Sequence, residues 1–306
     1  ANLCKLDSSE IPDWRKASRP FGENCGFTIG ESAQYIVLMD DDLAIDLAAD
    51  IHGAVPDVFI NADGIKRSIS APGVGNYISF SKAVASAVSI VGESTVREHS
   101  FIHAHGSSTP ANRVSESRIF DRIAEAFSIK EWPVTAAKAF VGHSLAAASG
   151  DQLSLALGTF KYNILPGIKT VDKIAEDVFQ DRLFFPLQDM DLIDRKMDVA
   201  FINSKGFGGN NATAVVLSPS KVEEMLSHRH SLVMVDYQKR RKDTRQAAAI
   251  YAEKADKGSI EVVYRFGEAL AEEADINISC DGLHMPGHSQ DVVFKKKNPW
   301  ADMQKK

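Results

Sequence analysis

A lysine and a histidine stand five positions apart, Lys138 and His143, ahead of a run of small residues. A second histidine, His105, begins the segment His-Gly-Ser-Ser-Thr-Pro, and a glycine-rich segment occupies residues 206–211. A cation and two imidazoles can bind an oxyanion that develops during a reaction. These residues therefore predict an active site that stabilises negative charge.

His105 directly follows a predicted strand, residues 101–104. The carboxyl ends of strands are where open α/β sheets build their sites. Ser107 and Thr109 place hydroxyl groups beside it. A single histidine at a strand end is more often structural than catalytic. A catalytic role for His105 is therefore indicated only in combination with the other motifs.

His143 follows Gly142 and precedes a predicted helix from Ser144 to about Tyr162, with Ser144 as its N-cap. A helix N-terminus lowers the pKa of a nearby imidazole and favours the neutral ring. A neutral ring still donates a hydrogen bond to an oxyanion. The alternative is a helix of small residues built only for close packing, which explains the alanines 146–148 but not the preceding Gly-His.

Lys138 lies in an apolar stretch, residues 136–140, so a buried Lys138 requires an ion-pair partner. Glu116, on a helix predicted over residues 113–128, is the candidate. Downstream, the glycines of segment 206–211 can bring backbone amides close to a ligand. That segment has neither the Lys-Ser/Thr ending of a P-loop nor a GxGxxG spacing, and alone it predicts only a hairpin turn.

No residue is a convincing nucleophile. Of the three cysteines, Cys25 has no neighbouring base, and Cys4 and Cys280 stand in no recognisable catalytic setting. Cys280 with His284 and His288 is too sparse for a zinc site, so we expect no metal. The cysteines are also too few for a disulfide framework, which favours a reducing cytoplasm.

Composition argues against a nucleic-acid-binding protein and against a membrane-spanning protein. The 306 residues carry a net charge of −6 and are 44% hydrophobic, as in ordinary soluble globular proteins. An acidic chain is not expected to bind nucleic acid over a broad surface. No apolar run has the length of a membrane span, and residues 1–5 contain no signal-peptide core.

Apolar patterning predicts strands that alternate with helices, and hence an α/β fold with a largely parallel sheet. The last two strands should form an antiparallel hairpin at one edge. The predicted strands are 33–39, 51–60, 101–104, 134–136, 199–203 and 212–217, and the predicted helices are 40–49, 77–96, 113–128 and 144–162. Residues 220–306 differ in character and predict an extension packed on the main body.

Together the motifs resemble the C-terminal half of the β-ketoacyl synthases, the 3-oxoacyl-[acyl-carrier-protein] synthases of the thiolase-like superfamily. The resemblance covers about residues 17–218, and the tail suggests a longer bacterial subgroup with a C-terminal extension. It rests on four motifs in the family's order: residues 105–110, Lys138, residues 142–143 and residues 206–211. Further segments of resemblance are 17–21, 26–31 and 70–72.

The resemblance implies a thiolase-like layered α-β-α fold, of which this chain holds the C-terminal half and the end of the N-terminal half. Residues 1–60 would end the N-terminal half. Residues 61–219 would form the C-terminal half, and residues 220–306 the extension.

The resemblance also implies a reaction, the decarboxylative Claisen condensation of malonyl-acyl carrier protein with an acyl thioester in fatty acid biosynthesis. His105 and His143 would stabilise the enolate, with Lys138 and Glu116 as electrostatic support. Phe207, with Gly206 and Gly208, would hold the acyl-transfer oxyanion and gate entry. Three hydroxyl residues, Ser107, Thr109 and Ser70, would line the pantetheine channel.

Cofactors and partners follow from the same resemblance. No cofactor is covalently bound, and substrates arrive on the phosphopantetheine of acyl carrier protein or coenzyme A. The nucleophilic cysteine would lie upstream of residue 17, so we expect a fragment that is inactive without its missing N-terminal half and that dimerises as the full-length protein. One alternative is a non-catalytic partner subunit of a synthase heterodimer. A degradative thiolase would need a cysteine in residues 206–211, which contain none.

Overall fold

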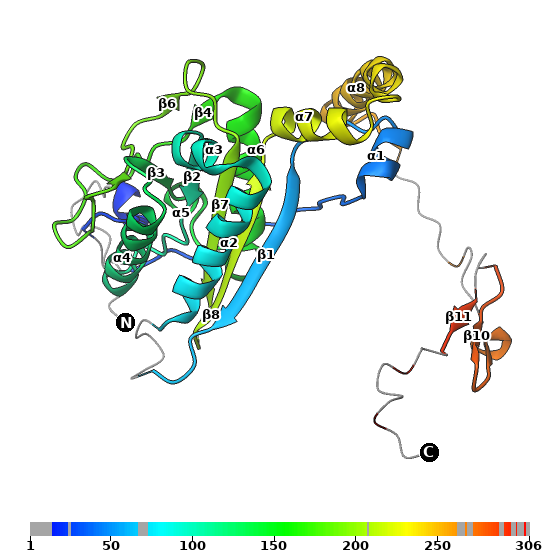
Figure 1. Cartoon of the computed structure of the whole chain (residues 1–306), viewed down its shortest axis with the longest axis horizontal. Coiled ribbons are helices and arrows are strands. Elements are labelled where there is room, and N and C mark those ends of the chain that lie inside the picture. The colour runs from blue at the N-terminus through cyan, green and yellow to red at the C-terminus, as the bar shows by residue number, and fades with distance from the viewer. Residues whose placement is uncertain are drawn as a thin grey trace. The chain divides into compact units, whose positions relative to one another are not determined.

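The computed structural model describes residues 14–23, 26–66, 73–206, 208–261, 267, 272–287, 291–294, 298 and 303. The chain divides into two compact units, residues 1–246 and 247–306 (Figure 1). The candidate catalytic residues all belong to the first unit.

A six-stranded mixed sheet forms the centre of the first unit, in the order β1-β8-β7-β2-β3-β5. Neighbouring pairs among β7, β2, β3 and β5 are parallel, whereas β8 is antiparallel to both β7 and β1. The strands are β1 (Ala54–Ala62), β2 (Ser100–His103), β3 (Trp132–Thr135), β5 (Leu183–Phe184), β7 (Val199–Gly206) and β8 (Asn210–Leu217).

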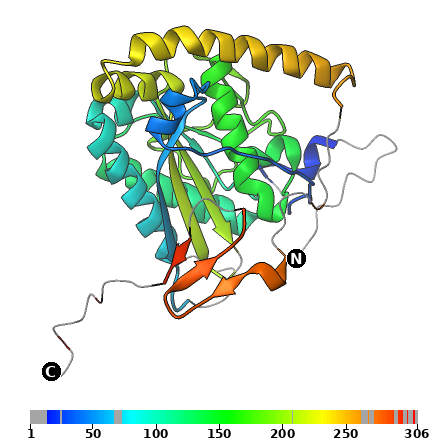
Figure 2. The same cartoon turned by 90° about the vertical axis from the view of Figure 1, so that its right-hand side faces the viewer.

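Helices cover both faces of this sheet, as Figure 2 shows for α2 (cyan) and α6 (green). One apolar cluster unites α2 and α4 with one face, and a second unites α6 with the other. The helices of this unit are α1 (Asp41–Asp46), α2 (Gly75–Val91), α3 (Glu93–Glu98), α4 (Pro110–Ala126), α5 (Lys138–Val141), α6 (Ala148–Tyr162) and α7 (Pro219–Arg229). The expected layered α-β-α architecture is thereby confirmed.

Large aromatic side chains fill the face beneath α2 and α4. The Phe80 ring lies 4.9 Å from that of Phe120 and 5.8 Å from that of Trp132, measured between centroids. Phe201 of β7 completes the group, and all four side chains are fully buried. This packing anchors β3 and β7, and the carboxyl end of β7 leads into the site.

Short elements complete the first unit: η1 (Trp14–Ala17), η2 (Leu145–Ala147), and a two-stranded sheet of β4 (Ile164–Leu165) and β6 (Met190–Asp191). Helix α8 (Met234–Asp256) begins in this unit and contacts α1, where the Arg240 guanidinium donates to the Asp46 carbonyl at 2.8 Å and to the Ile45 carbonyl at 3.1 Å. The second unit contains η3 (Glu273–Asp275) and a small antiparallel sheet of β9 (Asn277–Ile278), β10 (Gly282–His284) and β11 (Val292–Val293).

The strand predicted at residues 33–39 is wrong. This segment has no regular structure, and Tyr35 is 98% exposed and Val37 81% exposed. A strand needs a neighbouring strand to satisfy its amides and carbonyls, and the described part of the chain places none beside it. The helix that follows begins as predicted, because the Asp40 carboxylate accepts from the Leu43 amide at 2.8 Å.

Two other expectations need correction. The β7–β8 hairpin forms, but it does not lie at the edge, because β1 pairs with β8 over its length. The helix expected over residues 77–96 is interrupted at Gly92, whose φ of 86° ends α2 before α3 begins.

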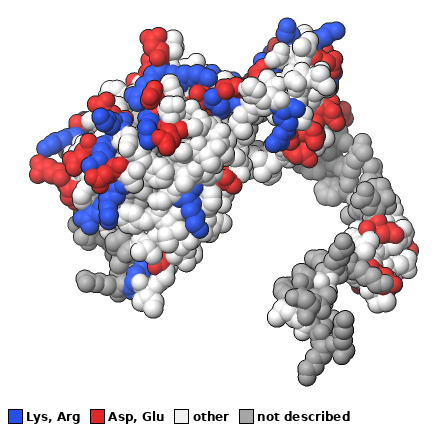
Figure 3. Space-filling model, in the orientation of Figure 1, with Lys and Arg blue, Asp and Glu red and all other residues white. Residues whose placement is uncertain are grey.

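Charge is unevenly distributed over the face shown in Figure 3. Charged side chains gather over the loops at its left and are sparse over α2 and β1. Helix α2 contains Lys82 as its one charged residue. Within the described ranges, no helix combines the length and apolar character needed to cross a membrane.

Candidate active site

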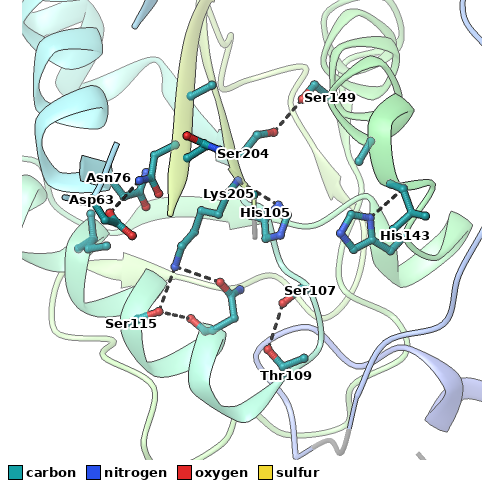
Figure 4. A pocket seen from close by; sticks show the side chains of 18 of the residues that line it. Asp63, Asn76, His105, Ser107, Thr109, Ser115, His143, Ser149, Ser204 and Lys205 are labelled. Carbon is teal, nitrogen blue, oxygen red and sulfur yellow. Dashed lines mark hydrogen bonds between the residues drawn. The ribbon is translucent and has the colours of Figure 1, made fainter. Parts of the chain in front are cut away.

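A cavity of about 950 Å³ at the carboxyl ends of β2 and β7 is lined by five of the residues singled out in the sequence: His105, Ser107, Thr109, His143 and Gly206 (Figure 4). His105 follows β2, and His143 follows α5 and Gly142. In Figure 4 the two rings lie next to each other at the cavity, and their centroids are 5.3 Å apart with an interplanar angle of 82°. A single small group can therefore reach both rings.

Backbone amides select the tautomer of both histidines. The Lys205 amide donates to His105 Nδ1 at 3.3 Å, and the Leu145 amide donates to His143 Nδ1 at 3.1 Å. Because each Nδ1 accepts a hydrogen bond, the proton of the neutral ring resides on Nε2. Neither Nε2 has a hydrogen-bond partner within the described residues. The pair thus presents two free N–H donors.

Both rings are neutral at physiological pH. Burial, assisted by the charge of Lys138, lowers the pKa of His143 to about 4. Burial also holds the pKa of His105 well below its ordinary value, with further contributions from Lys138, His143 and Lys205. The cause differs from the expected helix terminus, because only the single turn η2 follows His143. Ser144 does not cap a helix, and its hydroxyl instead donates to the Asp151 carboxylate.

Lys138 is buried and lies under the loop that carries His105. Its Nζ donates to the His105 carbonyl at 2.7 Å, and only 2% of the residue is exposed. Burial lowers the pKa of Lys138 to about 8, an effect partly offset by Glu116 and Asp151. The lysine therefore carries its charge at neutral pH and directs it at the backbone of His105.

The direct Lys138–Glu116 ion pair expected from the sequence is not formed. Glu116 is fully buried, and its carboxylate accepts a hydrogen bond from the His105 amide. Lys138 instead donates to the His105 carbonyl. The two oxygens of Glu116 accept four hydrogen bonds, from the amides of His105 (2.7 Å) and Gly106 (2.9 Å) and from the side-chain amides of Asn112 and Asn203 (2.8 Å each). The carboxylate thereby fixes the position of His105 from beneath.

The remaining predicted site residues are the hydroxyl residues of the expected pantetheine channel and the residues of the glycine-rich segment. The Ser107 and Thr109 hydroxyls are 3.1 Å apart, and both residues line the cavity together with Gly206. Gly208 lies in the β7–β8 turn with a φ of 82°, a conformation that favours glycine. Ser70 and Phe207 lie outside the described residues.

Sequence reasoning did not identify Lys205, which lines the same cavity. Its position immediately before Gly206, two residues after the predicted strand 199–203, was the available signal. Asn203 was also missed, although its side chain joins the Glu116 network.

The chain is similar in sequence to known β-ketoacyl synthases. Residues 52–172 match the family model described as the β-ketoacyl synthase C-terminal domain. The β-ketoacyl-[acyl-carrier-protein] synthase FabY of Pseudomonas aeruginosa is 61% identical over 302 residues, which are 98% of this chain and 48% of FabY. The 3-oxoacyl-[acyl-carrier-protein] synthase 2 of Synechocystis is 32% identical over 200 residues, 64% of this chain and 45% of that protein.

Solved structures of ketosynthases are also similar to this chain. The crystal structure of the noncanonical ketosynthase FabY from P. aeruginosa matches with a TM-score of 0.88 at 60% identity, over 97% of this chain and 46% of that one. A Streptomyces albus oxazolomycin ketosynthase domain matches at 18% identity with a TM-score of 0.60, over 66% of this chain and 36% of that domain. The second match supports the fold alone. The chain spans about half the length of the curated relatives it matches.

Proposed function

This chain carries the C-terminal domain of the β-ketoacyl synthases, and from that premise we propose that it supplies the enolate-stabilising part of a decarboxylative Claisen condensation in fatty acid biosynthesis. The observation that carries the proposal is the pair of Nε2–H donors of His105 and His143, which face one cavity from neutral rings. The substrate is a malonyl thioester on the phosphopantetheine of acyl carrier protein.

The proposed reaction begins when the thioester oxygen of the malonyl group accepts hydrogen bonds from both Nε2–H groups. The bond between the carboxylate carbon and the α-carbon breaks, carbon dioxide leaves, and the electron pair moves into the enolate. Two positioned donors stabilise the developing oxyanion more than the neutral thioester, which lowers the barrier. The enolate carbon then attacks an acyl thioester and expels the cysteine thiolate that held the acyl group.

Lys138 and Glu116 act in this scheme as positioning residues, because each contacts the backbone of His105 and not the cavity's centre. We assign Ser107, Thr109 and Ser70 to the pantetheine channel. Phe207, flanked by Gly206 and Gly208, is assigned to the acyl-transfer oxyanion site and to the gate. The hydroxyls of Ser107 and Thr109 support the channel assignment, since both line the cavity.

We place the nucleophilic cysteine in an N-terminal half that this chain does not contain. In this division residues 1–60 end that half, residues 61–219 form the C-terminal half, and residues 220–306 are the extension. The exposed apolar side chains of residues 35–39 support it, because burial of such a run needs another part of the protein. The full-length protein would act as a homodimer that receives acyl carrier protein.

The first experiment compares the chain with the full-length protein. Purified residues 1–306 are expected to form no condensation product from acyl and malonyl thioesters, whereas the full-length protein forms it. Product formation is measured by mass spectrometry of the carrier-bound thioester. Condensation by residues 1–306 unaided would contradict the assignment of the nucleophile to another part of the protein.

The pH dependence of malonyl decarboxylation gives a second test. His143 acts as a neutral donor and its pKa is about 4, so the rate is expected to fall as the pH drops through about 4. Lys138 acts as a cation and its pKa is about 8, so the rate is expected to fall again as the pH rises through about 8. Between these limits the rate should be constant. An inflection near pH 6.5, the value of an ordinary histidine, that disappears in His143→Gln would contradict the assignment.

Gly30 gives a structural test of how His143 is held. The His143 amide donates to the Thr28 carbonyl at 2.7 Å, and its carbonyl accepts from the Gly30 amide at 3.0 Å. A Cβ at Gly30 would lie 2.1 Å from the Val141 carbonyl oxygen, so Gly30→Ala must displace this segment. We expect a decarboxylation rate about tenfold lower, because donors even slightly misplaced lose much of their effect. Gly158→Ala, inside helix α6 and with no heavy atom within 4 Å of its added Cβ, is the control. An equal loss in both variants would contradict the displacement.

A further inference from the structure

Lys205 is a cavity residue for which the proposed reaction has no role beyond its backbone amide. It is the penultimate residue of β7, and its side chain extends from the sheet toward α4 (Figure 4). Its Nζ donates to Asn112 Oδ1 at 3.2 Å and to Ser115 Oγ at 3.1 Å. The ammonium group is therefore held in place beside the cavity that contains both histidines.

The charge of Lys205 is unbalanced. Both acceptors are neutral, and among the described residues Nζ forms no ion pair. Lys66, by contrast, pairs with Asp63 at 3.1 Å. Burial lowers the pKa of Lys205, and the more distant carboxylates of Glu116 and Asp63 offset this only in part. A partly buried cation without a counterion is costly unless an anion joins it.

The two carboxylates whose charge acts on Lys205, those of Glu116 and Asp63, accept hydrogen bonds from other donors. Glu116 accepts four N–H groups, as described above. Asp63 accepts from the Gly75 amide at 3.1 Å, from the Asn211 side chain at 2.8 Å and from Lys66. An ammonium has three N–H donors, of which two are used. One donor of Lys205 is left for a group that enters the cavity.

We propose that the Lys205 ammonium binds an oxyanion of the incoming ligand, a carboxylate or a phosphate, and so selects anionic over neutral ligands in this cavity. The proposal rests on the proposed function, because a malonyl group on phosphopantetheine carries both kinds of oxyanion. A salt-bridged hydrogen bond at a partly buried site is worth about tenfold in affinity.

The test measures binding to the full-length protein by calorimetry. The probes are pantetheine derivatives in which an amide replaces the thioester, so they neither transfer nor decarboxylate. Four probes are compared: malonyl and acetyl derivatives, each with and without the 4′-phosphate. Lys205→Met removes the charge at similar side-chain volume, Lys205→Arg keeps it, and Lys161→Met, which alters an exposed lysine beside Tyr162, is the control.

If Lys205 binds the carboxylate, Lys205→Met weakens both malonyl probes about tenfold and leaves acetyl probes unchanged. If it binds the phosphate, both phosphorylated probes weaken and the unphosphorylated ones do not. Lys205→Arg should retain most of the affinity in either case. Equal weakening of all four probes, or no change in any, overturns the proposal, and an unchanged melting temperature of Lys205→Met excludes misfolding as the cause. A wild-type protein that releases no carbon dioxide from malonyl-acyl carrier protein would instead overturn the proposed function.

Discussion

Replacing His143 by alanine in the full-length protein is expected to lower the rate of malonyl decarboxylation by about 10²- to 10³-fold. That is the usual cost of removing one donor from a preorganised oxyanion site. The loss should appear mainly in kcat, because the hydrogen bond to Nε2–H strengthens as the enolate forms. Release of carbon dioxide from labelled malonyl-acyl carrier protein measures it. His143→Gln, which retains a side-chain N–H donor, should lose less.

A matched control separates this effect from general damage. His228 is an exposed histidine of α7, and His228→Ala should leave the rate unchanged. Unchanged condensation in His143→Ala would favour the other hypothesis, in which the chain is a non-catalytic partner that shapes the cavity of another synthase. A partner of that kind would not need two adjacent neutral histidines that line the same cavity.

Local patterns were sufficient to predict much of the site. His105 and His143 were predicted from their places after a strand and after a glycine, and the fold brings their rings to 5.3 Å. Glu116 and Lys138 were also identified, but as partners of each other. Their true arrangement, with one on the amide side and one on the carbonyl side of the His105 loop, depends on the path of the backbone in three dimensions. Periodicity and motif spacing carry no information about that path.

The errors have a common physical origin in long-range pairing. Residues 33–39 have the apolar composition of a buried strand, but a strand also requires an edge to pair with. Strand β1 pairs with β8, which is about 150 residues away in sequence. The residues near either strand give no indication of that pairing. Lys205 was overlooked for a related reason, since its importance comes from the absence of a nearby free carboxylate and not from its own neighbours in sequence.

Glu116→Gln is expected to have the largest effect on the stability of the site. The carboxylate accepts four hydrogen bonds, whereas an amide has one oxygen and turns two N–H donors toward the donors of the loop. Buried N–H groups left without acceptors cost about 1–3 kcal/mol each, so we expect the free energy of unfolding to fall by about 3 kcal/mol. Urea denaturation followed by circular dichroism measures it.

The same substitution should also lower decarboxylation by about tenfold or more at saturating substrate, because His105 Nε2 is held through the backbone that Glu116 binds. Glu125→Gln, an exposed position on the same helix, should change stability by less than about 1 kcal/mol, the value of its surface ion pair with Arg182. Glu116→Asp keeps a carboxylate and should recover part of both losses. A Glu116→Gln protein with wild-type stability and rate would show that His105 is positioned without this carboxylate, and Lys138 would then be its principal support.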